Sequence, residues 1–201
     1  MIHSSNGAIK GHFNCGSSIE LITSNGAIEA SVSLLNQENG KPSELKMKTS
    51  NGYIYDFVQS VLPADYQHIS KIDAKVDLIT HSGQDGIFDV ETHTSNGAVT
   101  LEYSDMPINA VLMSEATSSN AASIVKLHSA FEGSFEVSTS NAPATLKELS
   151  AEDPSGQGRR RVVTQKREKN RVRGSAYWSD SRQPKGRAVV STSNGRAELV
   201  I

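Results

Sequence analysis

The side chains best suited to metal binding or acid-base chemistry lie close together between positions 81 and 93. They are His81, Asp85, Asp89, Glu91 and His93. Their spacing is not that of a zinc motif. The alternation of Asp89, Glu91 and His93 is that of side chains on the exposed face of a strand. We therefore interpret these residues as surface positions and expect the chain to bind no metal and no cofactor.

Catalysis needs a set of groups that the sequence does not supply. The chain has no nucleophile elbow and no glycine-rich phosphate-binding loop. A β-helix enzyme acting on polysaccharides would need paired carboxylates at a defined separation. Asp73 and Asp77 are four residues apart, and no acidic pair recurs at equivalent repeat positions. The sequence favours a protein that is not an enzyme, with a polysaccharide-active β-helix enzyme as the alternative.

One stretch is strongly basic. Positions 159–173 contain eight basic residues and one acidic residue, a net charge of +7 in a chain of −2, so the remainder carries −9. We interpret it as a solvated loop, with a binder of anionic partners as the alternative. Nucleic acid is not an expected partner, because the run lacks aromatic residues for base stacking. The basic residues are Arg159, Arg160, Arg161, Lys166, Arg167, Lys169, Arg171 and Arg173.

A four-residue motif, Thr-Ser-Asn-Gly or a close variant, occurs along the whole chain. Alternate positions before the motif asparagine are apolar, and the parity changes after it: Leu21 and Thr23 precede Asn25, while Ile28 and Ala30 follow it. This period of two is typical of half-buried strands. The motif therefore ends one strand and begins another with the same core on one side. Its asparagines are Asn6, Asn25, Asn51, Asn96, Asn120, Asn141 and Asn194.

Two all-β folds agree with this parity. In an antiparallel meander or sandwich, Asn-Gly closes hairpins. In a β-solenoid resembling a parallel β-helix, Asn-Gly forms a corner, and equivalent corners stack about 4.8 Å apart. A hairpin does not need the same Thr-Ser before every turn, whereas stacked corners allow identical polar side chains to form ladders. We therefore predict a β-solenoid with the motif asparagines in a corner ladder, and keep the antiparallel fold as the alternative.

Successive motif asparagines are 19, 26, 45, 24, 21 and 53 residues apart. In the 45-residue gap, Val76 to Gly83 matches Ile19 to Gly26 position by position, and we interpret it as a degenerate copy. The 53-residue gap contains the basic stretch. We expect one domain in three parts: a β-repeat region at 1–149, a basic loop insertion at 150–174, and C-terminal strands at 175–201 that complete the same domain.

The cadence of the motif, with Phe131 to Ala142 and Arg187 to Gly195 as clear copies, resembles the adhesin head-domain type of β-helical repeat protein. It is closer still to a group of fungal proteins of unknown function with the same repeats. The resemblance covers the chain except positions 153–173. It implies an adhesin-like, non-catalytic structural or binding role and offers no catalytic residues.

Composition leaves the compartment and the ligand open. Cys15 is the only cysteine, which excludes an internal disulfide. The first residues enter a repeat without the features of a signal peptide, no stretch is apolar enough for a membrane span, and the chain is open to being a fragment. A glycan or a protein surface is the kind of partner we expect.

Overall fold

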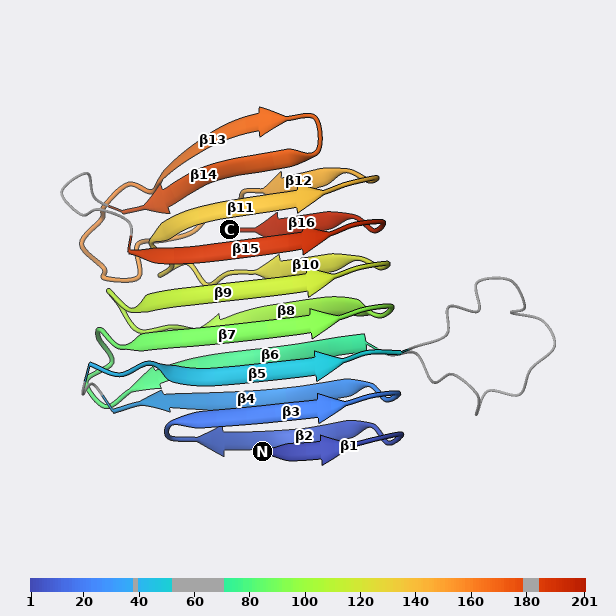
Figure 1. The fold of residues 1–201 in the computed structure, drawn as a ribbon. Helices are drawn as coiled ribbons and strands as arrows, with labels where there is room; N and C mark the ends of the chain where they lie inside the picture. The colour runs from blue at the N-terminus through green and yellow to red at the C-terminus, as the bar shows by residue number, and fades with distance from the viewer. Residues whose placement is uncertain (38–39, 52–70, 179–184) are drawn as a thin grey trace.

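The computed structural model describes residues 1–37, 40–51, 71–178 and 185–201, which form two β-sheets and contain no helix (Figure 1). The class is therefore all-β, as the sequence predicts. The nine-stranded sheet has the order β1 (Ile2–Ser4), β3 (Ser18–Thr23), β5 (Ser43–Thr49), β7 (Ile87–Thr94), β9 (Val111–Ser118), β15 (Gly186–Thr192), β11 (Gly133–Thr139), β14 (Arg171–Tyr177) and β13 (Val162–Glu168).

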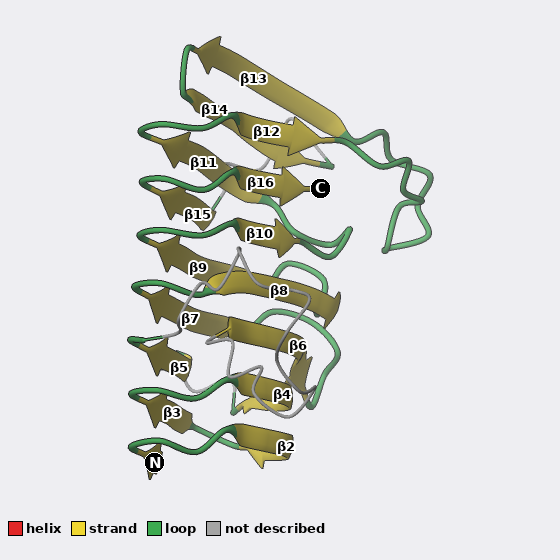
Figure 2. Ribbon diagram, turned by 90° about the vertical axis from the view of Figure 1, so that its right-hand side faces the viewer, coloured by secondary structure: helices red, strands yellow, loops and turns green. Residues whose placement is uncertain are grey.

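The second sheet faces the first across the core (Figure 2). From β1 to β12 the chain alternates between the two sheets, so each motif corner connects a strand of the nine-stranded sheet to the next strand of the other one. The seven-stranded sheet has the order β12 (Ala144–Lys147), β16 (Ala197–Val200), β10 (Ser123–Lys126), β8 (Ala98–Asp105), β6 (Lys71–Thr80), β4 (Ile28–Asn36) and β2 (Ile9–Cys15).

Most neighbouring strands pair in parallel. Thr23 of β3, for example, lies opposite Thr49 of β5, which lies opposite Thr94 of β7. The motif corners therefore do not close hairpins, and the antiparallel alternative does not describe these sheets. Within the described residues, antiparallel pairing is confined to β11 with β14 and β13 with β14.

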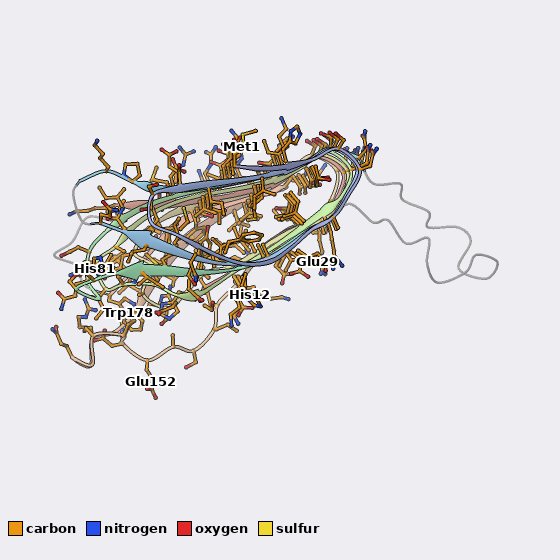
Figure 3. The ribbon with its side chains drawn as sticks, turned by 90° about the horizontal axis from the view of Figure 1, so that it is seen from below. Met1, His12, Glu29, His81, Glu152 and Trp178 are labelled. Carbon is orange, nitrogen blue, oxygen red and sulfur yellow. The ribbon has the colours of Figure 1, made fainter. Side chains whose placement is uncertain are left out.

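The core lies between the two sheets and follows the period of two. In β5 the side chains of Ser43, Leu45, Met47 and Thr49 are buried while the residues between them are exposed. Figure 3 shows the chain turning from one sheet to the other at one end of the cross-section, with side chains filling the space between the sheets. Branched aliphatic residues make up much of this core, and the rings of Phe88, Tyr103 and Phe131 are buried within it.

The order of the strands in space departs from their order in sequence at one place. β15 lies between β9 and β11, and β16 lies between β10 and β12. The C-terminal strand pair therefore fills a gap that the earlier strands leave open (Figure 1).

The 45-residue gap does not contain a degenerate motif copy. Val76–Gly83 covers the end of β6 in the seven-stranded sheet and the corner after it, whereas Ile19–Gly26 covers most of β3 in the nine-stranded sheet and the motif corner after it. The two segments match because both are alternating strands that end in a turn. The corner at Ser82 and Gly83 lies at the opposite edge from the motif corners.

The segment 150–174, which we expected to be a solvated loop, contains most of a β-hairpin. β13 and β14 pair with each other, and β14 pairs with β11. Val172 and Ala176 face the core, while Arg171 and Arg173 occupy alternate positions and pair with Glu136 at the surface. The positive charge of the segment therefore comes from its outward-facing residues. β14 is amphipathic, although the net charge of the segment does not indicate it.

Candidate functional site

The motif corners form a ladder along one edge of the two sheets (Figure 1). In most steps the Nδ2 atom of one asparagine donates to Oδ1 of the asparagine beside it. Backbone bonds also join neighbouring corners; for example, Asn51 N donates to Ser24 O at 2.8 Å. The side-chain bonds are Asn25 to Asn6 at 2.6 Å, Asn96 to Asn51 at 3.5 Å, Asn120 to Asn96 at 2.6 Å, Asn194 to Asn120 at 2.7 Å and Asn141 to Asn194 at 2.8 Å.

A second, buried ladder uses the first residue of the motif. The Thr23 hydroxyl accepts a hydrogen bond from Gly26 N at 3.2 Å within its own corner and donates to Gly7 O of the neighbouring corner at 3.0 Å. Thr192 does the same with Gly195 N at 3.3 Å and Ala121 O at 2.9 Å. One hydroxyl thus fixes the turn and joins it to the next.

The last residue of the motif lies against the neighbouring backbone. A Cβ atom on Gly26 would lie 2.3 Å from Gly7 O, and one on Gly195 would lie 2.1 Å from Ala121 O. Such distances are far below van der Waals contact, so glycine is required at both positions. The corner ladder therefore consists of neutral groups that satisfy one another, and none of them ionises near neutral pH.

The basic residues of 159–173 do not form one continuous positive surface. Arg171 and Arg173 each contact Glu136 at 3.2 Å. Lys166 lies 3.7 Å from Glu168, an exposed pair of little energetic weight. Within the described residues, no ion pair is formed by Arg160, Arg161, Arg167 or Lys169.

Asp153 organises the loop that leads into the hairpin. Its carboxylate accepts hydrogen bonds from the backbone of Ser155, Gln157 and Arg159. It also accepts from the Arg159 guanidinium, with Nη2 at 2.8 Å. The bond from Arg159 is the main reason that the pKa of Asp153 lies well below its usual range. Arg159 also lies 3.7 Å from Glu132, so its charge is matched within the protein.

Arg161 has a different environment two residues later. Its Cζ atom lies 5.6 Å from the centre of the Trp178 ring. Trp178 is buried, and its Nε1 donates to Ser129 O at 2.8 Å. The side-chain Nε and Nη2 atoms of Arg161 are buried and, within the described chain, have no hydrogen-bond partner. Burial is the main cause that lowers the pKa of Arg161.

The residues considered as metal ligands do not come together. Asp89, Glu91 and His93 lie in β7, whereas His81 and Asp85 lie in the corner that precedes it. Within the described residues, no group of three His, Cys, Asp or Glu side chains is placed to hold a metal ion. The pKa of Asp89 is raised, first by burial and then by nearby carboxylates, chief among them Glu44.

Charges on the seven-stranded sheet are mostly paired along the stack. Glu29 contacts Lys10 at 2.9 Å and Lys71 at 3.1 Å, and the hydrogen bond from Lys10 is the largest cause that lowers the pKa of Glu29. Lys126 contacts Glu102 at 2.7 Å in the same way. These pairs leave little unmatched charge on that part of the surface.

No model of a known protein family, no curated protein and no solved structure matches the chain significantly. None of the described segments is a helix of the length and apolar character needed to cross a membrane.

Three features of the motif corners and of the segment around the hairpin do not follow from the repeat pattern. They are the double role of the motif hydroxyl, the loop around Asp153, and the unpaired Arg161. Only the loop has a local signal: Asp153 followed by Pro154 and Ser155 is typical of a turn in which the aspartate accepts backbone hydrogen bonds. The other two depend on contacts between distant segments.

Proposed function

We propose that the two sheets form a β-solenoid and that the chain is a non-catalytic, adhesin-like module that binds an extended partner. The observation that carries this proposal is the pair of corner ladders, in which motif asparagines hydrogen-bond to one another and motif hydroxyls donate to the backbone of the next corner. The repeated residues thereby serve the architecture. The outward-facing residues of the strands between the corners are not needed for this stacking and are therefore available to contact a partner.

The outer face of the nine-stranded sheet is the surface that best suits such a partner. Parallel pairing aligns its side chains in rows, one of which runs through Glu44, Asp89, Met113 and Arg187. Met113 is 39% exposed. Burial and the nearby carboxylates raise the pKa of Asp89, and basic or hydrogen-bond-donating groups on a glycan or protein surface would stabilise its charged form.

The proposal is tested by incubating the purified chain with pectin, chitin, β-glucan and an array of proteins, and by measuring both retention and turnover. We expect retention without turnover. The double variant D89N/E115Q should weaken retention, whereas K75Q/E102Q on the outer face of the other sheet should not. Metal-dependent turnover, or a lack of retention on every surface, would contradict the proposal.

A second candidate function is binding of anionic partners by the hairpin. It is favoured by Arg160, Arg167 and Lys169, which are exposed and have no ion pair among the described residues. Retention on a phosphate-bearing resin should then fall in R160Q/R167Q/K169Q and remain in D89N/E115Q. Equal retention by both variants would exclude this role for the hairpin.

A further inference from the structure

Arg161 carries the buried polar side-chain atoms that, within the described residues, have no hydrogen-bond partner. Buried donors are nearly always satisfied in native proteins, and a charged donor is the most costly to leave unpaired. An unpaired pair of guanidinium N–H groups therefore needs an explanation, and a bound ion or small ligand is one of the few available.

Among the residues that the structure describes, the neighbouring carboxylates do not supply the acceptor. Asp153 is used by Arg159. Glu148 accepts from Gln165 Nε2 at 3.1 Å. Glu132 influences Arg161 only through longer-range electrostatics, because its ion pair is with Arg159. The three consecutive arginines thus differ: Arg159 is paired, Arg160 is exposed, and Arg161 is half-buried and unpaired.

Trp178 holds the guanidinium beside a fixed ring. The ring is buried and anchored through its Nε1 bond to Ser129 O, so its position does not depend on Arg161. The contact with the ring stabilises the cation but accepts none of its N–H bonds. The Nε and Nη2 atoms form the edge of arginine that binds the two oxygens of an oxyanion side by side.

We propose that Arg161 and Trp178 form a binding site for a compact oxyanion, the carboxylate or phosphate group of a ligand. Two of its oxygens would accept from Nε and Nη2. The two donor atoms are buried, whereas Arg161 as a whole is half-buried, so an oxyanion reaches them only when the side chains around them move. The site lies near the base of the hairpin and is separate from the sheet face proposed above to bind an extended partner.

Trp178 is the only tryptophan of the chain, so its fluorescence reports directly on this site. We would titrate the full chain with inorganic phosphate and, separately, with acetate, keeping ionic strength constant with chloride. A saturable change in fluorescence is expected with at least one of them. R161M should abolish it, whereas R196Q removes the same charge from an exposed arginine beside the last motif corner and should retain it.

Thermal unfolding provides the second measurement. An oxyanion that binds the native state raises the melting temperature of the wild-type chain and of R196Q. R161K keeps the charge without the side-by-side donors, so it should lose most of the shift even if R161M folds poorly. A response to phosphate alone, to acetate alone or to both supports the site and defines its preference. No saturable response, or the same response in R161K and wild type, would overturn it.

Discussion

In several corners the hydroxyl of the first motif residue makes a local and a long-range contribution at the same time. Ser118 accepts from Ala121 N at 3.1 Å and donates to Gly97 O at 2.8 Å. A hydroxyl can both donate and accept, whereas valine, of nearly the same shape, can do neither. This is the physical reason that the motif keeps a hydroxyl at a buried position where an aliphatic side chain would otherwise fit the core.

Replacing Thr23 by valine should therefore cost stability without changing the packing volume. Thr23 is 1% exposed, and the change leaves Gly26 N and Gly7 O without its hydroxyl. We expect a loss of about 1–3 kcal/mol in the free energy of unfolding, measured by urea denaturation. Thr100→Val, at an exposed position of β8, is the control and should change stability little. An equal effect of the two changes would refute the role of the hydroxyl.

His128 should make stability depend on pH. Its Nδ1 accepts from Ala130 N at 3.2 Å, and burial is the main cause that lowers its pKa below the ordinary 6.5. The unfolded chain therefore takes up a proton first as the pH falls, so the stabilisation is complete above 6.5 and is lost as the pH drops toward the folded-state pKa.

Urea unfolding at about pH 7.5 and about pH 5.5 measures this difference. In H128N, whose amide oxygen can still accept from Ala130, the difference should shrink. H12N removes an exposed histidine and should behave as the wild type. A wild-type pH difference that persists unchanged in H128N would show that another group causes it.

At the scale of elements, alternation is enough to predict strands and to separate inward from outward residues. It does not predict which strands pair, because Val76–Thr80 and Ile19–Thr23 have the same pattern and lie in different sheets. The net charge of the segment led us to predict a loop where the chain forms β14. The charge gives no sign of the inward-facing Val172 and Ala176. The carboxylate of Asp153 could be predicted to form a turn, but not to take Arg159 as its partner.

The loop before the hairpin should depend on Asp153. D153N removes the charge that pairs with Arg159 at 2.8 Å and weakens the acceptor for the surrounding backbone. We expect several-fold faster cleavage by a protease at positions 150–160, detected by mass spectrometry. E152Q, a change of the exposed neighbouring residue, should leave the cleavage rate unchanged.

The same contacts make the stability of the loop depend on pH in the acid range. The lowered pKa of Asp153 means that its stabilisation is present above the ordinary value of 3.8 and is lost as the pH falls through the folded-state pKa. Wild-type cleavage that already equals that of D153N at neutral pH would contradict the role of the carboxylate.

At the scale of the whole molecule, the main feature is the strand pair β15 and β16 between earlier strands. The Asn194 to Asn120 bond joins residues 74 positions apart, and no repeat pattern indicates that the last motif lies between the fifth and the sixth. Until β15 and β16 are in place, β9, β10, β11 and β12 each lack a neighbour on one edge. Formation of this part of the stack therefore depends on contacts that are far apart in sequence and slow to close.

Val190→Asn should reveal this dependence. Val190 is fully buried in β15, and its replacement places an amide in the core, which should cost about 3 kcal/mol or more. Val189→Asn, at the adjacent half-exposed position that faces outward, is the matched control and should be tolerated.

Because β15 joins β9 to β11, we expect native-state hydrogen exchange in V190N to accelerate first in β9 to β12 together with β15 and β16. Protection in β3 to β6 should persist, since those strands pair with one another and do not contact β15. Uniform loss of protection from β3 to β16 would instead show that the two sheets open as one cooperative unit.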